Sequence, residues 1–117
     1  MKKIIFNIKN REIKIKAKQV SFFGKFFGLM FSPLKNSSAL LFDFKKNCKI
    51  SIHSLFVFYE FLAIWFNERN EIVDAKIIKP FKLNVLPKKE FVKLLEIPIN
   101  NKYSKIVKIL VEKFRKV

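Results

Sequence analysis

The sequence predicts an α+β fold: one β-rich domain over residues 1–117, built on a bent antiparallel sheet or partial barrel. The chain has 117 residues, half of them hydrophobic, which suffices for one core and is too few for two. Short apolar or alternating segments recur between turn signals, as is typical of strands. The last segment instead repeats its apolar residues at helical spacing. We therefore expect a short early helix and a C-terminal basic amphipathic helix beside the sheet.

Residues 4–8 and 12–18 predict a β-hairpin with one solvated face, because apolar and polar residues alternate in both segments. Asn10 and Arg11 supply the turn between them. The outward row of the second strand is made of lysines, which discourage edge-to-edge pairing and also offer a positive surface to an anionic partner. These lysines are Lys14, Lys16 and Lys18.

Residues 20–31 predict the early helix, because their apolar side chains fall at helical spacing. Ser21 is suited to cap its start. Pro33 ends it, since the residue before a proline avoids the α region. We interpret the apolar stripe of this helix as part of the core. The stripe consists of Phe22, Phe23, Phe26, Phe27 and Met30.

Further strands are predicted over residues 39–44, 49–59, 61–67, 71–79 and 91–97. The run from Ile50 to Phe66 is almost wholly apolar, and Glu60 divides it into two strands. Pro80 and Pro98 stop the strands that precede them, because proline lacks the amide that a strand ladder needs.

The tail, residues 102–117, predicts a helix with apolar residues on one narrow arc and basic residues opposite. Asn101 is suited to cap its start, and the basic last turn complements the helix dipole. The helix either packs on the sheet with its lysines solvated, which we favour, or serves as a docking helix for a protein, a membrane-surface helix or a nucleic-acid contact. Its basic residues include Lys102, Lys105, Lys108, Arg115 and Lys116.

The charge balance predicts an anionic partner. The chain carries 25 Lys and Arg against nine Asp and Glu, a net charge of +16. Such a positive field attracts nucleic acid, anionic lipid or acidic protein, and it also keeps a small domain soluble. One cysteine, Cys48, excludes an intramolecular disulfide and favours a cytoplasmic location. We expect no transmembrane segment, because the longest apolar run, residues 55–66, is short and contains Glu60.

Five motifs follow one another along the chain: GLMF at 28–31, ALLFDF at 39–44, SIHSLFVF at 51–58, IWFNERNEIVDAKIIKPF at 64–81 and VKLLEIP at 92–98. In this order and spacing, residues 12–98 resemble the domain of unknown function 192 family, also called uncharacterised protein family 0127, in its archaeal form. The resemblance implies a compact β-rich domain with a short helix, and it implies no substrate or cofactor. The matching residues are Gly28, Leu29, Met30, His53, Phe56, Val57, Asp74, Pro80, Glu96 and Pro98.

The chain departs from that family pattern at one position of chemical interest. Where the family has Pro-x-Asp, this chain has Glu60, Phe61 and Leu62, so leucine replaces the family aspartate. In a strand, residues 60 and 62 share a face, and Glu60 is therefore placed to compensate. The glycine that the family has soon after Pro98 is also missing.

The sequence predicts a ligand pocket centred on His53. This residue is the only histidine in the chain and the only side chain that ordinarily titrates near neutral pH. Such a pocket would have acid–base chemistry available. A lone histidine on an apolar strand is more often a core residue, so we assign no catalytic residue. We expect no metal and no cofactor, since metal ligands are few and no phosphate-binding motif occurs. The other residues of the pocket are Ser51, Glu60, Asp74 and Glu96.

Three functional hypotheses follow. The first is a non-enzymatic binding module whose lysine-rich face docks on an anionic partner, RNA or the ribosome. Exposed aromatic rings would strengthen this hypothesis by stacking on bases, and Tyr59, Phe81 and Tyr103 are the candidates. The second is a small-ligand or enzymatic pocket centred on His53. The third is a protein-interaction subunit that docks through helix 102–117.

Overall fold

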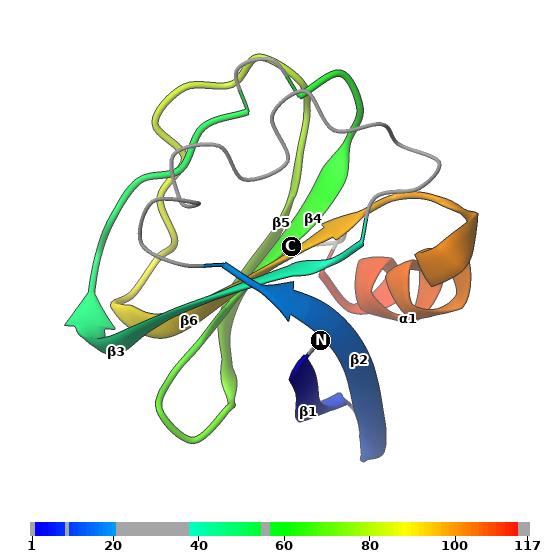
Figure 1. Cartoon of the computed structure of the whole chain (residues 1–117), viewed down its shortest axis with the longest axis horizontal. Coiled ribbons are helices and arrows are strands. Elements are labelled where there is room, and N and C mark those ends of the chain that lie inside the picture. Colours follow the sequence, from blue (N-terminus) through cyan, green and yellow to red (C-terminus); the bar gives the residue numbers. More distant parts are fainter. Residues whose placement is uncertain (1, 9, 21–37, 55–56, 115–117) are drawn as a thin grey trace.

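The computed structural model describes residues 2–8, 10–20, 38–54 and 57–114. Six strands form one sheet in the order β1-β2-β3-β6-β4-β5 (Figure 1). The predicted early helix over residues 20–31 lies, apart from Val20, outside the described residues. The strands are β1 Lys2–Ile8, β2 Arg11–Gln19, β3 Leu40–Cys48, β4 Phe61–Phe66, β5 Ile72–Ile78 and β6 Phe91–Pro98, and the helices are η2 Asn101–Tyr103 and α1 Ser104–Phe114.

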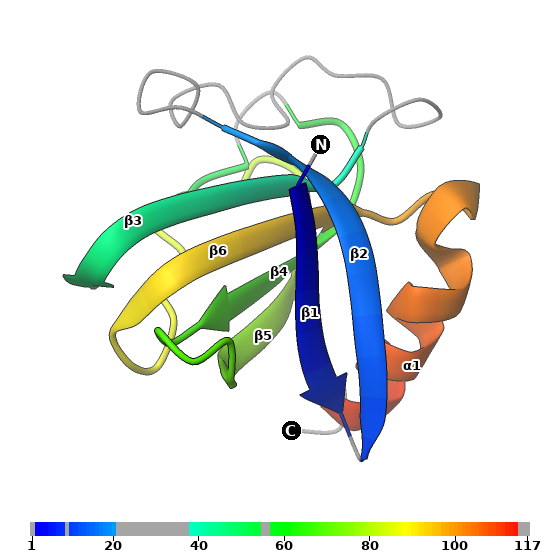
Figure 2. The same cartoon turned by 60° about the horizontal axis from the view of Figure 1, so that its bottom comes forward.

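The sheet curls into a half-barrel, as Figure 2 shows, which confirms the bent sheet predicted from the sequence. It is not purely antiparallel, however. β2 and β3 run parallel and pair only through Lys18 with Leu40 and Gln19 with Leu41. A parallel pair needs a crossover of roughly a dozen residues or more, and the segment between β2 and β3 is long enough to supply one. The other neighbouring strands pair antiparallel.

The N-terminal hairpin forms as the alternation predicts. β1 and β2 pair in register from Lys2 with Ala17 to Ile8 with Arg11. The turn residue Asn10 has a φ of 66°, a left-handed conformation that asparagine tolerates better than most residues. The inward apolar side chains of the hairpin are buried, and Lys14, Lys16 and Lys18 lie on its exposed outer face.

The core has two parts, one on each face of the curled sheet. On the concave face, the hairpin and α1 pack against β4 and β6, and Phe6 contacts Phe66 with ring centroids 5.1 Å apart. On the other face, Trp65 and Phe91 form the centre of a second cluster. β4 lies between β5 and β6 with both faces covered, so every residue in it is buried.

The predicted strand over residues 49–59 is wrong. Its described residues, 49–54 and 57–59, are irregular, apart from one isolated bridge between Ile52 and Val85. Val57 and Tyr59 from this segment are nevertheless buried in the second cluster. The apolar composition of this segment therefore belongs to a loop that covers the sheet. Its backbone hydrogen bonds go to another loop and not to a neighbouring strand.

The C-terminal helix starts with η2 and continues as α1. Asn100, one residue before the predicted cap, accepts a hydrogen bond from Lys102 N–H at 3.1 Å through its side chain. Val107 and Leu110 are buried in the concave cluster. The buried Tyr103 hydroxyl accepts a hydrogen bond from Ala39 N–H at 2.7 Å, which ties the helix to the start of β3. In the described part of the chain, no helix has the length and apolar character needed to cross a bilayer.

Candidate functional site

Ser54 holds two loops together through both its backbone and its side chain. Its Oγ donates to Lys79 C=O at 2.6 Å and accepts from Lys82 N–H at 2.7 Å. Its backbone N–H donates to Lys82 C=O at 2.8 Å, and its C=O accepts from Phe81 N–H at 2.9 Å and Val57 N–H at 3.1 Å. Ser54 is fully buried, so the turn at residues 79–82 has a fixed position over the sheet.

This turn presents an exposed aromatic pair. Phe58 is 63% exposed and Phe81 is 54% exposed, and their ring centroids lie 5.5 Å apart in an edge-to-face arrangement. Phe81 has a φ of 61°, a left-handed conformation that is unfavourable for a bulky residue. Lys79, Lys82 and the 66%-exposed Leu83 belong to the same turn and its continuation, and both lysines are exposed. The turn thus exposes the Phe81 ring, which contacts Phe58, and carries two exposed lysines.

The three aromatic residues that the sequence offers for base stacking differ in their exposure to solvent. Phe81 is exposed, whereas Tyr59 and Tyr103 are buried. Sequence reasoning missed Phe58 and Ser54. No sequence signal separates Phe58 from its neighbours, because Val57 and Tyr59 are equally apolar or aromatic and only the structure shows them buried on either side of it. No local pattern marks Ser54, because its partners lie 25 and 28 residues away.

The predicted lysines of the hairpin are exposed. On the same outer face, Lys3 lies directly opposite Lys16, and like charges in that position are destabilising. The nearby Glu12 lies 3.4 Å from Lys14 Nζ, in an exposed ion pair of small energetic value. Lys102, Lys105 and Lys108 are also exposed, while Arg115 and Lys116 lie outside the described residues.

The hairpin and the C-terminal helix bring their lysines together at Ser38. A shallow depression of about 560 Å³ is lined by Lys2, Lys18, Gln19 and Ser38. Lys102 Nζ donates to Ser38 Oγ at 3.0 Å, so a third cation reaches the same place. No carboxylate lines this depression among the described residues, and it therefore has the charge expected of an anion site.

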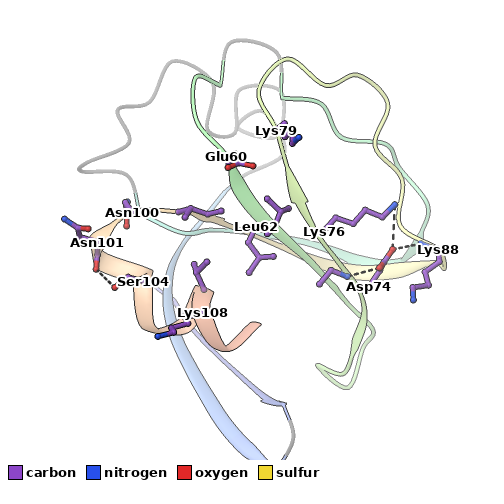
Figure 3. A pocket seen from close by; sticks show the side chains of 14 residues that line it. Glu60, Leu62, Asp74, Lys76, Lys79, Lys88, Asn100, Asn101, Ser104 and Lys108 are labelled. Carbon is purple, nitrogen blue, oxygen red and sulfur yellow. Dashed lines mark hydrogen bonds and ion pairs between the residues drawn. The ribbon is translucent and has the colours of Figure 1, made fainter. Parts of the chain in front are cut away.

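A second concave feature, which we call the groove, lies between β5 and α1 (Figure 3). Its volume is about 1000 Å³, at the upper end of the range typical of ligand sites. Apolar side chains cover its floor, and polar and charged side chains surround them. The apolar residues are Leu62, Ala75, Ile77, Ile99 and Val107, and the others are Glu60, Asp74, Lys76, Lys79, Lys88, Asn100, Asn101, Ser104 and Lys108.

Asp74 has a structural role at the edge of the groove. Its Oδ1 accepts from Ala75 N–H and its Oδ2 from Lys88 N–H, both at 2.9 Å. Lys76 Nζ lies 4.0 Å from the same carboxylate and donates to Leu86 C=O at 2.6 Å. Figure 3 shows the contacts of Asp74 with Lys76 and Lys88 at the β5 side of the groove. Asp74 and Lys76 together hold the segment before β6 against β5.

The groove contains only part of the predicted His53 pocket. Glu60 and Asp74 both line the groove, but Ser51, His53 and Glu96 do not. Ser51 and His53 are exposed. Leu62, which stands at the family aspartate position, is buried on the groove floor beside Glu60.

Glu96 is a buried carboxyl on β6. It lies between Leu40 on β3 and Ala63 on β4, its partners in the sheet register. Burial raises the pKa of Glu96 from its ordinary value of 4.5 to about 8, because an apolar environment disfavours the charged form. On β4, the indole Nε1 of Trp65 is also buried and has no hydrogen-bond partner among the described residues.

Within the part of the chain that the structure describes, no group of three or more His, Cys, Asp or Glu side chains could hold a metal ion. The arrangement instead offers three binding features: an exposed aromatic pair, a lysine cluster at Ser38 and an apolar groove with a charged rim. Each can bind a partner without covalent chemistry.

No known family model matches this chain, and no curated protein matches it in sequence. Two solved structures share its fold. One is a protein of unknown function from Novosphingobium aromaticivorans, with a TM-score of 0.71 and 9% identity over 90% of this chain and 77% of the other. The second, a candidate transcription regulator from Sinorhizobium meliloti, has a TM-score of 0.70 and 11% identity over 88% and 82% of the two chains. At such identities the likeness concerns the fold.

Proposed function

We propose that this protein is a non-enzymatic binding module for an anionic polymer, RNA in free or ribosomal form. The observation that carries the proposal is the exposed ring pair of Phe58, from the segment before β4, and Phe81, from a lysine-bearing turn. Bases of every type stack on aromatic rings, and each stacked base contributes roughly 1–3 kcal/mol. The net charge of +16 adds a sequence-independent attraction to phosphates.

The way the turn is held supports binding over core packing. Burying Phe81 would be the ordinary use of a phenylalanine, yet its ring is exposed and its backbone is in an unfavourable region. The hydrogen bonds of Ser54 keep that conformation in place. A fixed ring loses little conformational entropy when a base stacks on it.

The lysine cluster at Ser38 supports the electrostatic part of the proposal. Lys2 and Lys18 come from the N-terminal hairpin and Lys102 from the start of the C-terminal helix, so their proximity at Ser38 is a product of the fold. Lysine contacts to phosphate carry no sequence information, so we expect binding with little sequence preference.

The test is fluorescence anisotropy with a labelled oligouridylate. We expect affinity to fall steadily as salt rises. Replacing Phe58→Ala together with Phe81→Gly should weaken binding by about tenfold or more, because one stacked base is lost. The matched control is Ile5→Ala, which removes an exposed apolar side chain from the hairpin. Binding that is insensitive to salt, or equal in the two variants, contradicts the proposal.

We also propose, on the ordered motifs within residues 28–98, that the chain is a divergent archaeal-type member of the domain of unknown function 192 family. A cytoplasmic location is part of the same proposal and rests on the single Cys48. An alignment built from close homologues would test the membership, which predicts His53 and Glu96 at fixed motif positions.

A further inference from the structure

The groove has the geometry of a site for an added strand. β5 is an edge of the sheet, so one side of it is not paired with another described strand. Ala75 N–H donates to the side chain of Asp74, which indicates that Ala75 turns its backbone groups away from β4. Because alternate residues of an antiparallel strand direct these groups to the same side, Ile77 offers its N–H and C=O along this edge.

The two faces of β5 differ in chemistry. Ala75 and Ile77 lie on the face that looks toward α1, where Val107 and Ile99 complete an apolar wall. Asp74 and Lys76 alternate with them and lie on the opposite face. An extended chain beside β5 would alternate in the same way, with apolar side chains toward α1 and polar side chains opposite.

The charge of the rim selects an acidic occupant. Four lysines line the groove against two carboxylates, and the Asp74 carboxylate already accepts two backbone N–H groups. Lys79, Lys88 and Lys108 make no ion pair with any described residue. A second copy of this chain is disfavoured, because it would bring another net charge of +16 to the same edge.

We propose that the groove binds an extended acidic segment of a partner protein, which pairs with β5 as an additional strand while α1 forms the opposite wall. The segment alternates apolar residues with Asp or Glu. Backbone hydrogen bonds to Ile77 supply the register, and the lysines at the rim supply the charge preference. The groove shares Lys79 with the turn that carries Phe81 but includes neither ring of the aromatic pair, and its test involves no RNA.

The probe is a short capped peptide that alternates valine and glutamate, added to the full chain. Two-dimensional NMR should show the largest amide shifts at Ala75, Ile77 and Val107. A peptide of equal composition, with its valines and glutamates in two blocks, should bind about tenfold more weakly, because it cannot match both faces of β5. N-methylation of the peptide amide that faces Ile77 should cost about tenfold as well, since its hydrogen bond to Ile77 C=O is lost and the methyl group obstructs the strand pairing.

Charge-reversal variants distinguish binding in the groove from attraction to the net positive charge of the whole protein. Lys88→Glu with Lys108→Glu changes the rim, whereas Lys49→Glu with Lys105→Glu makes the same change in net charge at exposed sites outside the groove. The rim pair should weaken binding about fivefold more than the control pair. The proposal would be overturned if the rim pair and the control pair weakened binding equally, or if the block peptide bound as tightly as the alternating peptide. It would also be overturned if N-methylation had no effect or if the amide shifts centred on the hairpin lysines.

Discussion

Replacing Ser54→Ala should destabilise the fold and disturb the aromatic pair. The substitution deletes an Oγ that donates to Lys79 C=O at 2.6 Å and accepts from Lys82 N–H at 2.7 Å. A hydrogen bond of this kind contributes a net 0.5–1.5 kcal/mol, so two of them amount to about 1–3 kcal/mol. The lower part of that range applies where water reaches the freed groups, since Lys79 and Lys82 are exposed residues.

Urea unfolding followed by Trp65 fluorescence measures this cost directly, because Trp65 is the only tryptophan and is fully buried. Ser51→Ala is the matched control, since Ser51 is exposed three residues earlier. It should change the free energy of unfolding by less than about 0.5 kcal/mol. The oligouridylate affinity of Ser54→Ala should also fall, although Ser54 itself is buried. Equal stability of the two variants would refute the role assigned to Ser54.

Three further predictions concern stability. Phe81→Gly should be more stable than Phe81→Ala by about 1 kcal/mol in urea unfolding, because glycine adopts a φ of 61° without strain; the reverse order would exclude strain there. Tyr103→Phe should lower the free energy of unfolding by about 1–3 kcal/mol, because it leaves the buried Ala39 N–H without its acceptor. Unchanged stability would mean that water replaces the hydroxyl. Glu96 has a pKa of about 8 in the fold, compared with an ordinary value of 4.5. The protonated carboxyl therefore contributes fully to the free energy of unfolding below pH 4.5. This contribution falls by about 1.4 kcal/mol per pH unit as the pH rises and stops falling above pH 8. Glu96→Gln should flatten that decline in unfolding measured across this range, and an unchanged slope would contradict the raised pKa.

The strands could be predicted where burial alternates or where a strand is covered on both faces. The hairpin follows the first pattern, and β4 follows the second, so both were located within a residue or two. The parallel contact of β2 with β3 could not be predicted, because it depends on the path of the chain between them and involves two register pairs.

The error at residues 49–59 has a physical cause. A loop that covers an apolar sheet must itself be apolar, so Val57 and Tyr59 resemble strand residues in composition. What distinguishes the loop is the destination of its backbone hydrogen bonds, and those go from Ser54 to residues 79–82. Partners that far apart leave no periodic signal in the sequence.

The candidate site was predictable in its charge and not in its geometry. The lysine counts indicated an anionic partner, but only the fold brings Lys18 and Lys102 to Ser38. The same limit applies to the groove, whose two walls come from β5 and α1. Glu60 and Asp74 proved to share that groove, whereas His53 lies outside it.

The most direct test of the central claim is NMR observation of the Phe58 and Phe81 ring protons while a single-stranded oligouridylate is added at low salt. Base stacking on these rings predicts upfield shifts of both rings that saturate with the oligonucleotide. An RNA duplex of the same length should leave the rings nearly unshifted, because its bases are already stacked. Ring signals that stay unchanged while the RNA binds elsewhere would contradict the account.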